Sequence, residues 1–428
     1  MNRELLEFID NSPSPFHAVD NAGKLLESKG FTRLFEGEKW NLIPGNSYYV
    51  TRNLSSIIAF KIPKNSFNSF MMTASHCDSP AWKIKENAEL CDGPYLKLAT
   101  EGYGGMICST WMDRPLSVAG RIVVKTDSGM STRLIDLKKP VTVIPNLAIH
   151  FNRNVNDGYK FNKAVDMIPL FDSADKVGKF RKDIADAAGV KPEDIITTDL
   201  IVYNPEKGTE WGSFISAPRL DDLQCAFSAL KAFSECQNEK SVPVYCCFDN
   251  EEVGSTTKQG AASTFLCDTL ERIAECLNLS KEEYKKAVAN SFMLSCDNAH
   301  AVHPNHPEVM DKSQHTLMNK GIVIKYNANQ KYTSDAVSAG IFQLICEKAG
   351  VPFQHYANRA DMAGGSTLGN ISNTQVSLNT VDIGLSQLAM HSAYETAGAS
   401  DTEYMVKAIT VYYNSSIKMN SDGNYDLI

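Results

Sequence analysis

The chain has 428 residues, of which 43% are hydrophobic and 21% are charged, a composition typical of globular proteins rather than of disordered or membrane proteins. Its 42 lysines and arginines and 50 aspartates and glutamates give a formal net charge of −8, which argues against binding nucleic acid or anionic membranes through clustered cations. No apolar run reaches the roughly 18 residues that a membrane span needs, and the N-terminus lacks the apolar core of a secretory signal.

The 11 cysteines are odd in number and form no Cys-x-x-Cys pair, so neither a thiolate zinc knuckle nor a thioredoxin-type redox site is indicated. Several lie in apolar stretches such as VPVYCCF, where cysteine behaves as a small hydrophobic residue. Both features are typical of a reducing compartment, and we expect a cytoplasmic protein.

The first part of the chain is expected to be helical and then extended. A helix is predicted over 14–30, because Pro15 suits the first helical position and Gly30 suits the end. Three strands are then expected, at 47–52, 56–62 and 69–74. Residues 81–215 differ in character, with Gly-rich turns such as EGYGGM and short β-branched strands, which indicates an inserted β-rich domain.

From residue 216 onward, predicted strands alternate with predicted helices. Apolar runs predict strands at 242–249, 291–297 and 321–326. Helical spacing predicts helices that begin near 222 and that cover 259–277, 334–350 and 401–413. This alternation favours an α/β fold with a mostly parallel mixed sheet that is flanked by helices on both faces.

Several predicted strands end in a residue that can bind a metal, at the edge where ligands gather in open α/β sheets. In chain order the candidates are His76 and Asp78, Asp221, Glu251 and Glu252, Asp297 with the nearby His300 and His303, and His391. Each has an ordinary alternative when taken alone. An aspartate can cap a helix, an adjacent glutamate pair is usually solvated, and a histidine can simply lie in the core or on one helical turn.

Taken together, two imidazoles and three carboxylates form a mixed nitrogen and oxygen set that suits zinc, with cobalt or manganese as alternatives. The set consists of His76, His391, Asp221, Glu252 and Asp297. A catalytic zinc usually keeps three protein ligands and an open position, so five ligands suit two metal ions that share one carboxylate. Asp78 could then orient His76, and Glu251 is left as a carboxylate that could take a proton from water.

Matching stretches over nearly the whole length resemble the aspartyl aminopeptidase family of dizinc exopeptidases. The strongest are SHCDSP, STWMDRPLSVAGR, LAIHFNRNVN, APRLDDL, DNEEVGS, DNAHAVHPNHPE and AMHSAYETAG. The resemblance implies a zinc-dependent metallo-aminopeptidase that removes N-terminal residues from peptides, acidic residues in one branch of the family. It assigns His76, Asp221 and Asp297 to one zinc, and Asp221, Glu252 and His391 to the other. Glu251 would be the general base in the activation of water by two metals, and Asp78 would orient His76.

The resemblance also implies an architecture and an assembly. A catalytic domain of the zinc-exopeptidase type would be split into 1–80 and 216–428 around a dimerisation domain at 81–215, and dimers would form a homododecamer. His150 matches a histidine that reaches a neighbouring subunit's active site. Lys325 matches a lysine near the substrate side-chain pocket, although an ordinary solvated lysine at a strand end is the alternative. We also expect His300 to lie near the substrate.

Three departures from the acid-preferring branch affect the substrate more than the metal. Cys77 replaces a usual threonine, Asp222 replaces a frequent asparagine, and NRADMAGGSTLG replaces a loop that shapes the substrate pocket. Two rival functions stay open: a dizinc carboxypeptidase or deacylase, which the ligand set alone does not exclude, and a catalytically silent shell-forming protein. Because every expected ligand and the base are present, loss of catalysis is the weaker of the two.

Overall fold

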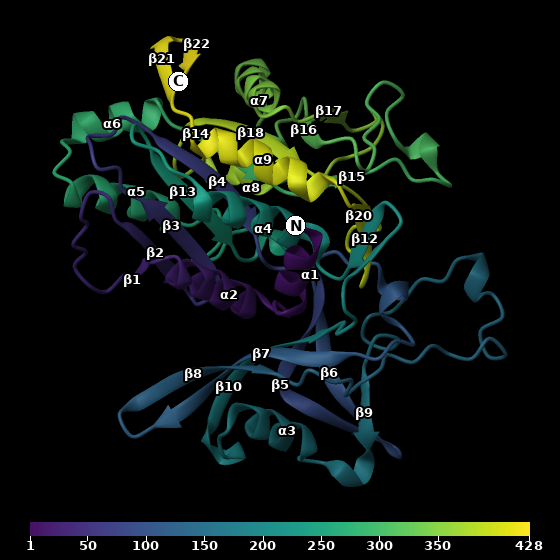
Figure 1. The fold of residues 1–428 in the computed structure, drawn as a ribbon. Coiled ribbons are helices and arrows are strands. Elements are labelled where there is room, and N and C mark those ends of the chain that lie inside the picture. Colours follow the sequence, from purple (N-terminus) through teal and green to yellow (C-terminus); the bar gives the residue numbers. More distant parts are fainter.

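The structure is a computed structural model that describes residues 1–428, and a nine-stranded mixed sheet forms its centre (Figure 1). In spatial order its strands are β1 (Thr32–Leu34), β2 (Ser47–Arg52), β3 (Ser56–Lys61), β13 (Val242–Phe248), β4 (Phe70–His76), β14 (Phe292–Cys296), β18 (Asn379–Gly384), β16 (Ile322–Tyr326) and β17 (Phe353–Ala357). The central strands β13, β4, β14 and β18 pair in parallel, whereas β3 pairs antiparallel with β13 and β16 pairs antiparallel with β18. Their carboxyl ends therefore meet at one edge.

Helices cover both faces of this sheet because its central strands are apolar on both sides. On β14, Leu294 packs into one core and Met293 into the other. One face is covered by α1 (Asn2–Asp10), α2 (Pro15–Ser28), α4 (Leu220–Glu235), α7 (Ala336–Ala349) and α9 (Asp401–Tyr413). The other face is covered by α5 (Phe265–Cys276), α6 (Lys281–Ala289) and α8 (Leu368–Ser372). Such a sheet is stable only when both faces are buried.

A second sheet of six antiparallel strands lies beside this α/β body, below it in Figure 1. Its strands in spatial order are β8 (Gly129–Asp136), β7 (Ser117–Thr126), β10 (Ile195–Tyr203), β5 (Ala81–Asp92), β6 (Tyr95–Tyr103) and β9 (Leu170–Ser173). Together with α3 (Lys179–Ala188) it encloses a core of its own. Helix α2 lies between the two bodies, against β3 and β7 (Figure 1).

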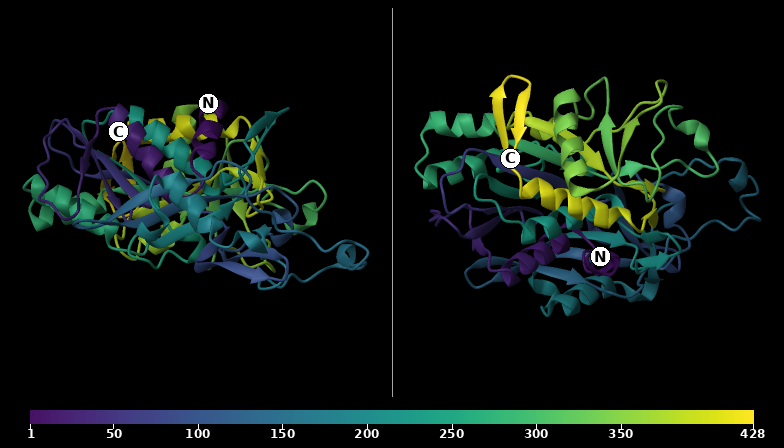
Figure 2. Two further views of the ribbon diagram at one scale, coloured as in Figure 1. Left: turned by 90° about the horizontal axis from the view of Figure 1, so that it is seen from below. Right: turned by 45° about the horizontal axis from the view of Figure 1, so that its top comes forward.

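Smaller sheets complete the fold. A five-stranded sheet holds β11 (Thr209–Trp211), β12 (Phe214–Ala217), β20 (Glu395–Gly398), β19 (Ser386–Leu388) and β15 (Ala299–His300). The C-terminal hairpin of β21 (Ile417–Ser421) and β22 (Asn424–Leu427) projects from the side opposite the six-stranded sheet (Figure 2). Each helix is too short or too polar to cross a membrane.

The elements expected from the sequence agree closely with the observed ones, and the differences have local reasons. The strand expected to end at residue 74 continues to His76, because β4 stays paired with β13 there, with Phe248 opposite His76. The helix expected from residue 259 begins only at Phe265, because the chain makes a tight loop before it, in which a side chain at Gly260 would collide with the carbonyl oxygen of Ser255. His300 and His303 share no helical turn, because His300 ends the short strand β15.

Candidate metal centre

The candidate ligands gather where the central parallel strands end. β4 ends at His76, Asp297 directly follows β14, and the turn Glu251–Val253 follows β13. Asp221 lies in the first turn of α4, which crosses this edge, and His391 lies between β19 and β20. The central sheet therefore brings three of these segments together at the ends of its strands, and α4 and the connection from β19 to β20 add Asp221 and His391.

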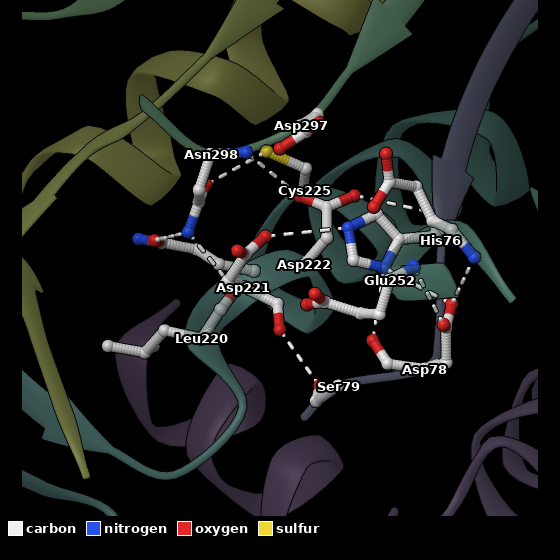
Figure 3. A network of polar contacts seen from close by, with 12 residues as sticks. His76, Asp78, Ser79, Leu220, Asp221, Asp222, Cys225, Glu252, Asp297 and Asn298 are labelled. Atoms are coloured by element: carbon white, nitrogen blue, oxygen red, sulfur yellow. Dashed lines mark hydrogen bonds and ion pairs between the residues drawn. The ribbon is translucent and has the colours of Figure 1, made fainter. Parts of the chain in front are cut away.

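The convergence forms two groups that share one residue. The potential ligand atoms of His76, Asp221 and Asp297 all lie within 4.8 Å of one another, and so do those of Asp221, Glu252 and His391. Figure 3 shows His76, Asp221, Glu252 and Asp297 facing a common space. The two groups are the sets that the sequence predicted for two metal ions.

Asp221 lies between the two imidazoles. Its Oδ1 is 3.4 Å from Nε2 of His76, and its Oδ2 is 3.4 Å from Nε2 of His391. Oε2 of Glu252 is 3.3 Å from the same His391 nitrogen. A carboxylate whose two oxygens face different imidazoles is suited to bridge two cations, one beside each ring.

Two buried oxygen atoms at the centre have no hydrogen-bond partner, namely Oδ1 of Asp221 and Oε1 of Glu252. A buried carboxylate oxygen without a partner is costly, because it has lost its hydration. A cation would supply the missing partner, and the nitrogen and oxygen donors around both atoms are those that zinc accepts. The residues present therefore fit divalent metal ions.

Asp78 holds the segments beside the ligands. Its Oδ1 and Oδ2 accept the backbone N–H groups of Glu251 and Glu252, each at 3.1 Å (Figure 3 labels Asp78 and Glu252). Nδ1 of His76 lies 3.4 Å from Oδ1 of Asp78 and 3.0 Å from its carbonyl oxygen. With Nδ1 engaged in this way, Nε2 of His76 is directed toward Asp221, the usual arrangement for a metal-ligating histidine.

The electrostatics show an excess of negative charge at this edge. Burial, together with neighbouring carboxylates, raises the pKa of Glu251 to about 8 and raises the pKa values of Glu252 and Asp297. Burial alone would lower the pKa of His391, but Asp221 and Glu252 outweigh it and raise that pKa to about 10. In the absence of a metal, protons would neutralise this cluster; a cation performs the same role without them.

Two acidic residues that the motif analysis left without a role support the ligands. Glu395 accepts the backbone N–H of His391 at 2.7 Å and that of Asp221 at 3.1 Å. Asp222 accepts the N–H of His76 at 3.2 Å and that of Asn298 at 3.2 Å. Asp222 thus joins two strand ends instead of facing the ligand space. Glu395 lies four residues after His391 in the stretch AMHSAYETAG, and this closeness is the only sequence signal for its place at the centre.

The residues expected near the substrate occupy different surroundings. Lys325 is not a solvated lysine: it is 2% exposed, and its Nζ lies 2.9 Å from the carbonyl oxygen of Asn298 and 3.6 Å from Oδ1 of Asp297. His300 lines a cavity of about 260 Å³ next to the ligand His391, whose neighbour Met390 lines it too. His150 is exposed and makes no hydrogen bond or ion pair with a candidate ligand within this chain.

The departures from the acid-preferring pattern lie around the centre rather than in it. Sγ of Cys77 donates to the carbonyl oxygen of Ser55 at 3.1 Å, so this buried thiol is turned away from the ligands. The segment NRADMAGGSTLG contributes Asn358, Arg359 and Met362 to the cavity that His300 lines. The segment that replaces the family's loop therefore borders the cavity beside the candidate metal centre.

Comparisons with known proteins point in one direction. The sequence pattern of the family described as aminopeptidase I zinc metalloprotease (M18) matches residues 8–413. A probable M18 family aminopeptidase 2 from Clostridium novyi is 45% identical over 423 residues, which cover 96% of this chain and 98% of the relative.

Solved structures give the same result. A chain in the cryo-EM structure of the Ape4 and Nbr1 complex is 35% identical and superposes with a TM-score of 0.92, over 96% of this chain and 84% of that one. The mApe1 dodecamer of S. cerevisiae is 27% identical with a TM-score of 0.85, over 96% of this chain and 95% of that one. Sequence and fold agree over almost the entire length, and the chain belongs to the M18 family of zinc metallo-aminopeptidases.

Proposed function

We propose that this protein is an aminopeptidase that uses two zinc ions per subunit to hydrolyse the first peptide bond of peptides. His76, Asp221 and Asp297 would hold one ion, and Asp221, Glu252 and His391 the other. The observation that carries the proposal is the sharing of Asp221 by two converging ligand groups. Cobalt or manganese would suit the same donors.

Zinc, when bound, polarises a carbonyl group and lowers the pKa of water toward neutrality. The remaining work falls to this chain's own residues. Glu251, whose N–H is anchored on Asp78, would take the proton of the attacking water and pass it to the departing amine. The charges of His76, Asp297 and Asp221 all act on its carboxyl, so Glu251 lies within electrostatic reach of both ligand groups. This closeness supports its role as general base.

The assembly follows from the relatives. Because a related structure is described as a dodecamer, we propose that this chain forms dimers that assemble into a homododecamer, with 81–215 as the dimerisation domain inserted into the split catalytic domain 1–80 and 216–428. The exposure of His150 suits a residue that reaches a neighbouring subunit. All 11 cysteines are free, which supports a cytoplasmic location.

An acidic N-terminal residue is the proposed substrate preference. Lys325 is the only lysine or arginine that pairs with a candidate ligand, at 3.6 Å from Asp297. Lys325 is buried behind Asp297 and does not line the cavity beside His391, which is lined instead by His300, His303 and Arg359. A carboxylate on the substrate would therefore meet basic groups close to the metal centre.

The two rival functions make different demands on the same centre. A carboxypeptidase or deacylase would share the ligands and the base, but membership of an aminopeptidase family favours removal of N-terminal residues. A silent shell-forming protein would have no need of the two partnerless buried oxygens of Asp221 and Glu252. Their retention supports a working metal centre.

Replacing Glu251 with glutamine should leave zinc binding intact and lower kcat by about 10²–10⁴-fold, because an amide cannot take the proton of the attacking water. Zinc content by atomic absorption and turnover of an aminoacyl-anilide check both halves. The exposed Glu239→Gln is the matched control and should match the unaltered protein. Full turnover by the Glu251 variant would refute its role as the base.

Removing the metal should abolish activity and make stability fall as pH rises from 6 to 8. In that range the folded metal-free protein retains protons on Glu251, whose pKa is raised to about 8, and on His391, whose pKa is raised to about 10, that the unfolded chain releases. Zinc binding displaces these protons, so at one fixed free zinc concentration the stabilisation should be larger at pH 8 than at pH 6. At one hundred times the Kd that holds at pH 8, it should be about 2.7 kcal/mol at that pH.

Thermal unfolding of chelator-treated protein with and without zinc, at both pH values, measures this effect. Equal stabilisation by zinc at pH 6 and pH 8 would contradict the assignment of this cluster as the binding site. Activity that survives exhaustive removal of metal would contradict the whole mechanism.

An aminoacyl-anilide panel should show hydrolysis with Asp- and Glu-anilides ahead of Leu-anilide, and none of N-acyl amino acids. Lys325→Met should lower the ratio of kcat/KM for Asp over Leu by about tenfold or more, the value of a charged hydrogen bond. The ratio separates substrate selection from any general effect through Asp297. An unchanged ratio would contradict the role of Lys325 in substrate selection and indicate that it only stabilises Asp297. Turnover of the N-acyl compounds would instead favour the deacylase.

A further inference from the structure

The Gly-rich turn EGYGGM, at residues 101–106, lies against the metal centre although it belongs to the six-stranded sheet. Strand β6 ends at Tyr103, and the chain then continues through Gly104 and Gly105. Tyr103 donates a hydrogen bond to Asp78, the carbonyl oxygen of Gly105 contacts the imidazole of His391, and Gly104 lies where an added Cβ atom would be 3.1 Å from Cβ of Glu252. The motif therefore lies at the metal centre, but it contains neither a proposed ligand nor the proposed base, so its role there is still to be explained.

Tyr103 completes the contacts of Asp78. Its hydroxyl donates to Oδ2 of Asp78 at 2.7 Å and accepts from Nδ2 of Asn250 at 2.9 Å. The same Oδ2 accepts the N–H of Glu252, while Oδ1 accepts that of Glu251. The phenol of Tyr103 thus fixes the carboxylate of Asp78, which in turn contacts His76 and holds the turn that carries Glu251.

His391 is held from the same segment at two points. Its Nδ1 lies 2.7 Å from the carbonyl oxygen of Gly105, and its own carbonyl oxygen accepts the N–H of Ile107 at 3.0 Å. Because a carbonyl only accepts, Nδ1 carries a proton, and Nε2, which faces Asp221 and Glu252, is the nitrogen that would bind a metal ion. His391 has a positive φ of 67°, so its unusual backbone is fixed by these contacts as well.

Gly104 lies beside Glu252, one of the proposed metal ligands. A Cβ atom at this position would be 3.1 Å from Cβ of Glu252 and 3.5 Å from Cα of Pro80, and the residue has a φ of +73°. A larger residue would push Glu252 away from His391. The glycine lets the turn approach the centre closely enough for Gly105 to reach the imidazole.

We propose that Tyr103, Gly104 and Gly105 are positioning residues of the metal centre. Tyr103 orients His76 through Asp78, Gly104 leaves the space that Glu252 occupies, and Gly105 orients His391 through its carbonyl oxygen. The inserted sheet would then contribute to catalysis within its own subunit, in addition to any contacts it makes between subunits. This inference rests on the proposed function, since it assumes that these ligands hold metal.

Tyr103→Phe removes only the hydroxyl. We expect zinc affinity about tenfold weaker at one position and kcat about tenfold lower with KM changed less than twofold, as is usual when a residue that orients a ligand loses its hydrogen bond. Affinity is measured by competition with a chromophoric chelator, independently of turnover. Tyr95→Phe, on the same strand and 55% exposed, is the matched control and should match the unaltered protein.

Gly104→Ala tests the close approach. We expect it to weaken zinc binding about tenfold or more at the position of Glu252 and His391. Gly93→Ala is the matched control: Gly93 has a similar positive φ, of 59°, but no atom lies within 4 Å of its added Cβ, so it carries the backbone strain without the contact. Circular dichroism establishes that both variants fold, and if Gly104→Ala does not, Tyr103→Phe decides alone.

Failure of the proposed function and failure of the positioning role give different experimental results. If the unaltered protein binds no zinc in the competition assay, the proposed function is wrong. If it binds two equivalents and the folded variants at 103 and 104 match it in zinc affinity and kcat, the positioning role is overturned. A purely structural role would lower the melting temperature while leaving zinc affinity unchanged, and that result would also overturn it.

Discussion

The structure depends on neutralising a cluster of carboxylates that the fold buries at one sheet edge. Asp221, Glu252 and Asp297 meet there with few compensating charges, namely two imidazoles and the ammonium of Lys325. An uncompensated buried charge costs several kcal/mol, so such a cluster persists only if protons or cations balance it. Burial, together with the neighbouring carboxylates, raises the pKa values of Glu252 and of the adjacent Glu251, and divalent metal ions would balance the negative charge.

The sheet turns this constraint into chemistry through two carboxylates with different tasks. Asp221 enters from α4 and faces both imidazoles, so it links the two ligand groups. Asp78 faces backbone N–H groups and His76 instead, so it sets where the base and one ligand lie. Exchange of Asp221 for a neutral residue would therefore affect both proposed metal positions. Exchange of Asp78 would affect both His76 and the proposed base, so we expect the centre to respond as a unit.

Much of this organisation could be predicted from the sequence. Apolar strands that end in His76, Glu252 and Asp297 indicated a common edge, because parallel strands in open sheets place their ends together. Other contacts could not be predicted, because they join segments whose pairing has no local signal. Tyr103 reaches Asp78 from another sheet, and Asp222 joins two strand ends through backbone hydrogen bonds. For Lys325 the sequence left open a solvated lysine at a strand end as the alternative to a place near the substrate, yet its strand β16 is interior and the side chain is buried.

The central claim is that five scattered side chains enclose two cations that share Asp221. Crystals grown with zinc, with diffraction recorded on both sides of the zinc absorption edge, would test it most directly. The account predicts two anomalous peaks per subunit, one beside Nε2 of His76 and one beside Nε2 of His391, with an oxygen of Asp221 on each. A single peak, or peaks away from Asp221, would contradict it.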